Sequence, residues 1–128
     1  MYTLYGIKGS GSAAIELALE AAHLPFQMVR AASWEADSAL AELASLNPLK
    51  QIPTLVLPDG SVMTESAAIL IHLGLTVPES PILPANAPAR AQALRGLVYI
   101  AANCYSAVSV TDFPERWCAN ADTDLKDR

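Results

Sequence analysis

The stretch LNPLKQIPTLVLPDGSVMTES, residues 46–66, carries the strongest structural signals in the chain. Pro53 stands directly before an apolar run that is typical of a buried strand. Because proline has no N–H to donate to a neighbouring strand, we expect it at the entrance of that strand. Asp59 and Gly60 then predict a tight turn that leads into a second short strand. The stretch therefore predicts two antiparallel strands joined by a turn.

The two ends of this unit predict a place for a ligand. A cis bond between Ile52 and Pro53 would leave the backbone polar groups of Ile52 pointing outward and unused, and such bonds are rare and usually kept for a purpose. Thr64, Glu65 and Ser66 indicate a polar helix start, where backbone N–H groups lack partners inside the helix. A free backbone edge beside a helix N-terminus suits a peptide-like anion.

The composition indicates a packed globular protein. The chain has 128 residues, of which 52% are hydrophobic and 16% are charged. This length supports one domain with a proper core, and the apolar content argues against disorder. The formal net charge is −5, and the eight basic residues are scattered. Nucleic acid is therefore not an expected partner, because phosphate binding needs clustered Lys and Arg.

Targeting and metal signals are weak in this sequence. The N-terminus has no basic flank followed by an apolar stretch, so we expect no signal peptide. The longest uncharged run, residues 96–111, is too short for a membrane span, so we expect a cytoplasmic protein without a membrane partner. Cys104 and Cys118 are isolated and have no metal-ligand spacing, which predicts reduced thiols and no metal site.

The first third of the chain predicts a parallel strand–helix–strand unit. Residues 2–5 form a β-rich run, and apolar residues recur at helical spacing between residues 12 and 23. Pro25 ends that helix, and residues 26–29 read as the second strand. Two strands separated by one helix within about thirty residues are typical of a parallel unit.

The remaining elements complete a mixed sheet. We expect a short helix over residues 34–46, strands over 54–57 and 61–63, and an apolar helix over 66–75. The second strand of the pair is antiparallel to the first. The resulting order is βαβαββα, an α/β arrangement on a mixed four-stranded sheet.

A change of composition predicts a second domain. Four prolines between residues 76 and 88 indicate a linker, and a long helix with two apolar faces should run from about residue 87 to 108. A polar tail follows. We therefore predict domains at residues 1–77 and 89–128, joined by a linker at 78–88.

The motifs resemble a known family. The spacing of Asn47-Pro48, Gln51-Ile52-Pro53 and Thr64-Glu65-Ser66 resembles that of the glutathione-binding half of the glutathione S-transferases, especially the bacterial, beta-like members. The resemblance covers most of residues 1–110. It implies a thioredoxin-like first domain and a helical second domain, which we expect to be incomplete because only its first helix is evident in residues 89–128. It also implies glutathione as co-substrate and assembly as a homodimer.

The resemblance also implies where the chemistry takes place. The nucleophile in this family is the thiol of glutathione, which is mostly protonated at neutral pH and needs help to ionise. Ser10 lies in the polar loop of residues 8–12 and is the predicted catalytic residue, since a hydroxyl that donates to sulfur favours the thiolate. Beta-like members carry a cysteine there, so Ser10 argues against thiol exchange. The alternative is that Ser10 and Ser12 merely form a turn and a helix cap.

The ligand-holding residues follow from the same resemblance. The backbone of Ile52 should pair with the peptide part of glutathione as an added strand would. Ser66 and the helix N-terminus should hold the γ-glutamyl carboxylate, and Glu65 the ammonium group. Family members usually have a basic or polar residue near the second helix that binds the glycine-end carboxylate of glutathione. This chain has no Lys or Arg there, so we expect Lys50 or Gln51 to bind that carboxylate instead. The predicted glutathione-binding set is Ser12, Lys50, Gln51, Ile52, Pro53, Glu65 and Ser66.

Two functional hypotheses follow. The first is an enzyme that conjugates reduced glutathione to small hydrophobic electrophiles in detoxification, with Asn103 and Tyr105 lining the second-substrate cleft. The second is a non-catalytic glutathione-binding or protein-interaction module of the same fold. A disulfide oxidoreductase is disfavoured, because no cysteine lies in the loop that follows the first strand.

Overall fold

The computed structural model describes residues 1–78, 80–114 and 117–118 of the chain. The chain divides into two compact units, residues 1–90 and residues 91–128. The division lies inside a helix that begins at Ala87. Each unit is treated by itself below.

A mixed sheet of four strands forms the centre of the first unit. The strands are β1 (Tyr2–Gly6), β2 (Phe26–Arg30), β3 (Thr54–Val56) and β4 (Val62–Thr64), in the spatial order β2-β1-β3-β4. β1 is parallel to β2 and antiparallel to β3, and β3 is antiparallel to β4. The predicted mixed four-stranded sheet is confirmed.

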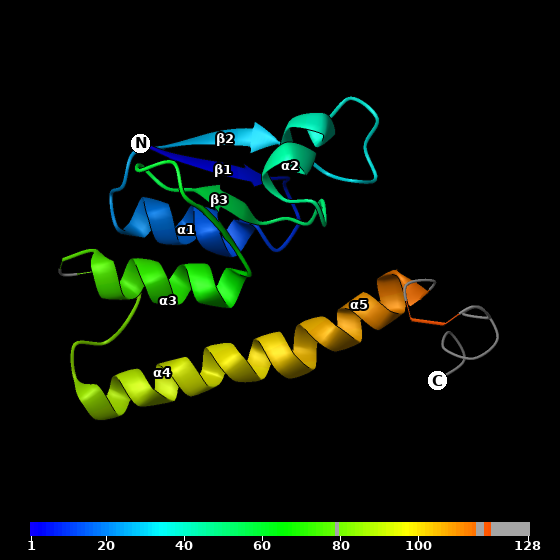
Figure 1. The fold of residues 1–128 in the computed structure, drawn as a ribbon. Coiled ribbons are helices and arrows are strands. Elements are labelled where there is room, and N and C mark those ends of the chain that lie inside the picture. Colours follow the sequence, from blue (N-terminus) through cyan, green and yellow to red (C-terminus); the bar gives the residue numbers. More distant parts are fainter. Residues whose placement is uncertain (79, 115–116, 119–128) are drawn as a thin grey trace. The chain divides into compact units, whose positions relative to one another are not determined.

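Three helices cover the two faces of this sheet. They are α1 (Ala13–Ala21), α2 (Leu40–Leu46) and α3 (Ser66–Thr76), which gives the predicted order βαβαββα. α1 and α3 lie on one side of the sheet (Figure 1) and contact each other. Leu4 is buried with side chains of these two helices, whereas the adjacent Tyr5 is buried with Leu43 of α2. This alternation is what a β-strand imposes on successive residues.

The turn between β3 and β4 forms at Asp59 and Gly60, as predicted. Gly60 has a φ of 88°, a conformation that glycine adopts without a steric cost. The Asp59 carboxylate accepts hydrogen bonds from the Ser61 hydroxyl and from the Ser61 N–H. These two bonds, the hydroxyl first, hold the pKa of Asp59 below its ordinary value. The side chain thus fixes the turn through its own backbone neighbours.

The predicted helix over residues 34–46 begins later than expected, at Leu40. The Ser38 hydroxyl lies 2.8 Å from the Ala32 carbonyl and 2.9 Å from the Glu35 carbonyl, and the Ala32 N–H donates to the same hydroxyl at 3.2 Å. Serine offers the backbone an alternative to helical hydrogen bonds in this way. The segment before Leu40 is consequently a loop of turns.

The described residues of the predicted linker, 78 and 80–88, belong to the first unit. Leu83 is only 6% exposed. A β-carbon built on Gly74 would lie 2.4 Å from the Leu83 Cγ, so the leucine side chain lies directly on the glycine of α3. Leu83 therefore anchors this part of the predicted linker to the first unit, which ends at residue 90. The domain bounds expected from the sequence stay a prediction.

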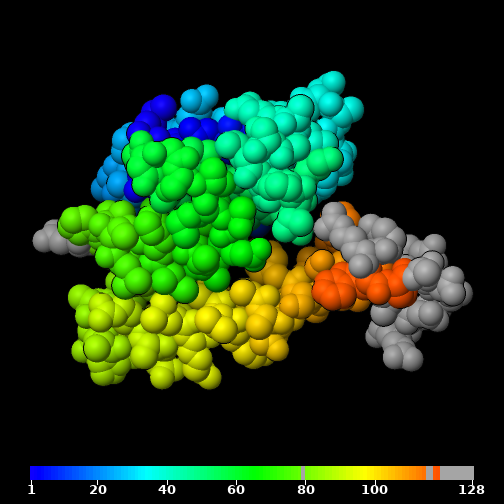
Figure 2. Space-filling model, viewed as in Figure 1, coloured from blue at the N-terminus to red at the C-terminus, as the bar shows by residue number. Residues whose placement is uncertain are grey.

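A continuous helical stretch runs into the second unit. It consists of α4 (Ala87–Tyr99), the π-helical η1 (Ile100–Tyr105) and α5 (Ser106–Asp112), and it appears as one rod in the space-filling view (Figure 2). The Ser106 hydroxyl donates to the Ala102 carbonyl at 2.5 Å within the π-helical turn. The predicted long helix is present and extends beyond residue 108, whereas most of the predicted polar tail lies outside the described residues.

The stretch 87–112 is long and apolar enough to cross a membrane by length and composition alone, and none of its most apolar window is buried. This is weak evidence for a membrane span, since helices of soluble proteins also pass the same test. Large apolar side chains on it are exposed, with Val98 58% and Tyr99 61% accessible.

Candidate functional site

Three predicted site segments leave the sheet at one end. Tyr5, Thr54 and Thr64 lie side by side across β1, β3 and β4. The loop of residues 7–12 follows β1 directly, residues 51–53 precede β3, and residues 65–66 follow β4. The antiparallel pairings therefore bring the polar loop, the Ile52 backbone and the start of α3 to the same edge of the first unit.

A closed hydrogen-bond network organises the loop after β1. The Ser10 hydroxyl donates to the Ile7 carbonyl at 2.7 Å and accepts from the Ser12 N–H at 3.2 Å. The two serine hydroxyl oxygens lie 2.8 Å apart. Ser10 itself is partly exposed. The predicted catalytic serine is thus held in a defined position at this edge of the first unit.

Ser12 differs from its predicted binding role. Its side chain is fully buried, and its hydroxyl accepts the Ile7 N–H at 3.1 Å. It takes the N-cap position of α1 but makes no capping hydrogen bond. Burial leaves it no surface for direct contact with glutathione, so any part that it has in binding is indirect. Gly6 lies against it, because a β-carbon at position 6 would clash with the serine side chain.

Asn47 fixes the segment that leads into β3. Its side chain is 5% exposed, and its Nδ2 donates to the Gln51 carbonyl and to the Thr54 Oγ1, both at 3.1 Å. Its Oδ1 accepts the Leu49 N–H at 3.1 Å, and the Thr54 hydroxyl donates to the Gln51 carbonyl at 2.8 Å. The sequence motif included Asn47, but its positioning role was missed. The signal available was a polar amide a few residues before a buried strand.

The bond between Ile52 and Pro53 is cis, as the sequence hypothesis required. Among the described residues no hydrogen bond reaches the backbone N–H or carbonyl of Ile52. Pro53 is buried, so it contributes to the shape of the segment and offers no polar contact. The free backbone groups of Ile52 have the donor and acceptor that an extended peptide would need.

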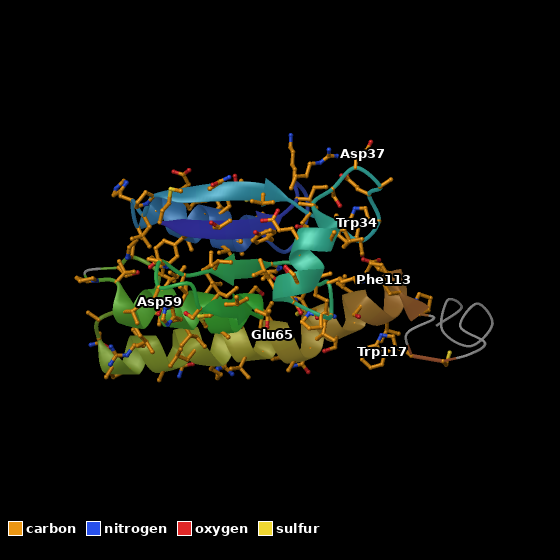
Figure 3. All side chains as sticks on the ribbon, turned by 45° about the horizontal axis from the view of Figure 1, so that its top comes forward. Trp34, Asp37, Asp59, Glu65, Phe113 and Trp117 are labelled. Atoms are coloured by element: carbon orange, nitrogen blue, oxygen red, sulfur yellow. The ribbon has the colours of Figure 1, made fainter. Side chains whose placement is uncertain are left out.

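The start of α3 carries unused polar groups. Glu65 takes the N-cap position with a φ of 66° and a ψ of 107°, a conformation that is rare for a residue with a side chain. Ile69 donates the first helical hydrogen bond to the Glu65 carbonyl, which leaves the earlier N–H groups available. Within the part of the chain that the structure describes, the Glu65 carboxylate and the Ser66 hydroxyl have no hydrogen-bond partner. Glu65 lies at the beginning of α3 (Figure 3).

The charges near this edge are few. Lys50 and Gln51 have exposed side chains, and Lys50 has a φ of 54°. Arg30 at the end of β2 forms an ion pair with Glu35. Lys50 is therefore an exposed cation in the segment just before Ile52. Throughout the described ranges, no group of three or more His, Cys, Asp or Glu side chains could hold a metal ion.

Tyr5 is buried in the first unit and hydrogen-bonded to Glu42. It is 4% exposed, and its hydroxyl donates to the Glu42 carboxylate at 2.5 Å. Burial, then the hydrogen bond to Glu42 and the charge of that carboxylate, raise the pKa of Tyr5 to about 12. A phenol that is buried and already donating cannot stabilise a ligand thiolate, so Tyr5 has a structural role.

Asn103 and Tyr105 lie in η1 of the second unit. The Asn103 amide donates to the Tyr99 carbonyl at 3.0 Å, so it is engaged within its own helix. Tyr105 is 45% exposed. Their role in a second-substrate cleft stays a prediction.

Similarity to known proteins identifies the family of this chain. Residues 12–76 match the family model described as the N-terminal domain of glutathione S-transferase. The chain belongs to the glutathione S-transferase family. It is 38% identical over 129 residues to the GST-like protein YncG of Escherichia coli, and the match covers 98% of this chain and 62% of that protein. It is also 46% identical over 50 residues to a maleylacetoacetate isomerase of Dictyostelium discoideum, which covers 39% of this chain and 22% of that protein.

A solved structure of the same family confirms the fold. A glutathione transferase homologue from Sulfitobacter, solved with bound glutathione, is 30% identical with a TM-score of 0.83 and covers 92% of this chain. The predicted thioredoxin-like fold is confirmed. The chain spans 57% of that structure's chain and 62% of YncG, so it corresponds to less than two thirds of these relatives.

Proposed function

We propose that this protein binds reduced glutathione and acts as a glutathione-dependent transferase on small hydrophobic electrophiles. The observation that carries the proposal is the convergence of three features at one end of the sheet. These are the partly exposed Ser10, the unpaired backbone of Ile52 and the open N-terminus of α3. The glutathione bound in the Sulfitobacter relative supports the choice of ligand.

Each polar group of the tripeptide has a partner in this proposal. The backbone of Ile52 pairs with the central peptide unit as an added strand does. The γ-glutamyl carboxylate lies at the start of α3, where the Ser66 hydroxyl, free N–H groups and the helix dipole favour an anion. Glu65 accepts from the ammonium group, and Lys50 or Gln51 meets the glycine-end carboxylate.

The chemical step is addition of the ligand's own sulfur to the electrophile. The Ser10 hydroxyl donates a hydrogen bond to the sulfur, which favours the thiolate over the thiol, and the thiol proton leaves to solvent. The thiolate then forms the carbon–sulfur bond, and the leaving group or the electron pair of the attacked double bond takes up the displaced charge. Ser10 remains chemically unchanged throughout.

The electrophile has two candidate classes. Conjugation at an activated aromatic carbon consumes the thiolate, whereas isomerisation of an activated double bond returns it after reversible addition. The maleylacetoacetate isomerase among the relatives supports the second class. Both need the same thiolate, so the two activities are measured in parallel on one preparation.

The competing proposal is a glutathione-binding module without turnover. The specific observation in its favour is that the Ser10 proton is engaged by the Ile7 carbonyl at 2.7 Å. Calorimetry with reduced glutathione, followed by a chlorodinitrobenzene-type conjugation assay and an isomerisation assay, separates the proposals. Binding with turnover supports the enzyme, binding without turnover supports the module, and no binding contradicts both.

Variants give the proposal its residue-level test. Ser66→Ala should weaken glutathione binding about tenfold, because a hydrogen bond to a carboxylate is lost, while the rate at saturation changes little. Ser10→Ala should lower the rate at saturation by about tenfold or more with a smaller effect on binding. Ser45→Ala, at an exposed serine of α2, is the matched control and should behave as wild type.

The native assembly and compartment also belong to the proposal. The family resemblance supports a cytoplasmic homodimer. Light scattering of the purified protein should give twice the 13.6 kDa mass of this chain. A single-chain mass would contradict the dimer and leave the glutathione site untouched.

A further inference from the structure

We propose that Ser12 is a positioning residue that frees the hydroxyl proton of Ser10 for the ligand thiolate. It would do so by taking over the hydrogen bond that Ser10 makes to the Ile7 carbonyl. This inference rests on the proposed function, since it concerns how the same serine becomes available to sulfur.

In the observed arrangement the Ser10 hydroxyl has no donor to spare. A serine hydroxyl has one proton and two lone pairs. The nearest acceptor for the proton is the Ile7 carbonyl at 2.7 Å. The oxygen receives the Ser12 N–H at 3.2 Å and faces the Ser12 hydroxyl at 2.8 Å. Because its one proton and both lone pairs are already engaged, the Ser10 hydroxyl cannot also donate to a thiolate.

Ser12 has two acceptors within reach and needs only one. Its oxygen accepts the Ile7 N–H at 3.1 Å. Its proton can go to the Ser10 oxygen at 2.8 Å or to the Ile7 carbonyl at 3.2 Å. When the Ser12 hydroxyl donates to the Ile7 carbonyl, that carbonyl keeps a hydroxyl donor. The Ser10 hydroxyl can then rotate away from the carbonyl and donate to the ligand. Two hydroxyl rotations accomplish the change, with no transfer of a proton between residues.

The burial of the two serines matches this division of roles. Ser12 is fully buried, so water does not compete for its proton, and Gly6 packs directly against its side chain. Ser10 is partly exposed and can meet a ligand. Ile7 is partly buried, and its carbonyl also accepts the Ser10 N–H at 3.2 Å. Ser12 therefore replaces the hydroxyl donor on a carbonyl that keeps its backbone donor, so release of the Ser10 proton costs this carbonyl no hydrogen bond.

A simpler role for Ser12 is to hold the loop in shape. The two roles differ in the ionisation of bound glutathione. If Ser12 supplies the substitute bond, Ser12→Ala leaves the Ser10 proton on the Ile7 carbonyl and raises the thiol pKa of bound glutathione as much as Ser10→Ala does, by about one unit. The double variant should show no further rise, because both changes remove the same donor from the sulfur.

The experiment follows thiolate absorbance against pH in complexes of glutathione with wild type, Ser10→Ala, Ser12→Ala, the double variant and the Ser45→Ala control. Calorimetry with S-methylglutathione, which has no thiol to ionise, checks that each variant keeps an intact site. A rise for Ser10→Ala without a rise for Ser12→Ala overturns this inference alone. Wild-type and Ser10→Ala complexes with the same thiol pKa overturn the thiolate role of Ser10 and the inference together.

A measurement on the unmodified chain covers the case in which Ser12→Ala does not fold. The carbonyl carbon of Ile7, observed by NMR, should change its shift as bound glutathione ionises, since its hydroxyl donor changes from Ser10 to Ser12. S-methylglutathione should leave that shift independent of pH over the same range. A shift that does not follow thiol ionisation contradicts the exchange.

Discussion

A β-carbon at Gly6 would lie 2.3 Å from both the Cβ and the Oγ of Ser12. Gly6 is the last residue of β1, and Ser12 is fully buried beside it. Gly6→Ala should therefore force the serine aside and lower the free energy of unfolding by about 1–3 kcal/mol, the usual cost of overpacking. Urea denaturation followed by circular dichroism measures this. Because the displaced residue is Ser12, the variant should also lose glutathione-dependent activity.

Gly96→Ala is the control for that substitution. Gly96 lies in α4, and a β-carbon at this position would meet no atom of the described residues within 4 Å outside its own helix. Its φ is an ordinary helical one. Alanine there should leave the first unit unchanged and favour the helix by up to about 1 kcal/mol. Equal destabilisation by both substitutions would show that the contact with Ser12 is not the cause.

The contact between Gly74 and Leu83 predicts a compensating pair. Gly74→Ala should destabilise the first unit, because its β-carbon would meet the Leu83 side chain at 2.4 Å. Leu83→Ala should cost about 2–5 kcal/mol through lost burial. In the double variant the shortened side chain leaves room for the new methyl group, so the combined loss should be smaller than the sum of the two. A thermodynamic cycle from urea unfolding tests this, and additive losses would contradict the contact.

Local patterns predicted the order of the elements, whereas other features of the fold depend on long-range contacts. The proline, the turn and the helix start in residues 46–66 are local signals, and each appears where it was expected. The later start of α2 depends on Ser38 reaching back to Ala32. The anchoring of the proline-rich segment depends on the contact of the Leu83 side chain with Gly74 on α3. No spacing rule in a single sequence reports such partners.

The same limit applies to the site. Ile52, Glu65 and Ser66 were predicted because their type and spacing form a motif. Ser12 was assigned to the ligand because it shares the polar loop of residues 8–12 with Ser10, yet its side chain is fully buried. Burial is a property of the folded unit, so the distinction between the partly exposed Ser10 and the buried Ser12 needed the structure.

The hydrogen bond from Tyr5 to Glu42 predicts a specific loss of stability in alkali. The pKa of Tyr5 is raised from 10.0 to about 12, so folding favours its neutral form. This contribution is complete below about pH 10 and is lost as the pH rises toward 12. Tyr5→Phe should cost about 1 kcal/mol at neutral pH and should flatten the loss between pH 10 and 11. Urea unfolding at several pH values measures both effects.

Tyr99→Phe is the control for the Tyr5 variant, because Tyr99 is 61% exposed. It should have a wild-type free energy of unfolding at neutral pH and a wild-type decline in alkali. If Tyr5→Phe shows the same alkaline decline as wild type, other groups cause it and the Tyr5–Glu42 bond does not contribute.

Asn47 predicts a link between stability and ligand affinity. Its amide joins the Gln51 carbonyl and the Thr54 hydroxyl, and its Oδ1 holds the Leu49 N–H. Asn47→Ala removes all three bonds and should lower the free energy of unfolding by about 1–3 kcal/mol. The segment that presents Ile52 is then less well held, so glutathione should bind more weakly in calorimetry even under conditions where the variant is fully folded.

Two further variants identify which part of the Asn47 side chain is responsible. Asn47→Asp keeps the acceptor for the Leu49 N–H but places an oxygen against the Gln51 carbonyl. Its stability should improve as the pH falls, because a protonated carboxyl group can donate where the amide did. Asn103→Ala removes an exposed amide that bonds only within its own helix, and it should leave glutathione affinity at the wild-type value. Wild-type affinity in the folded Asn47→Ala variant would show that the Ile52 segment holds its shape without this side chain.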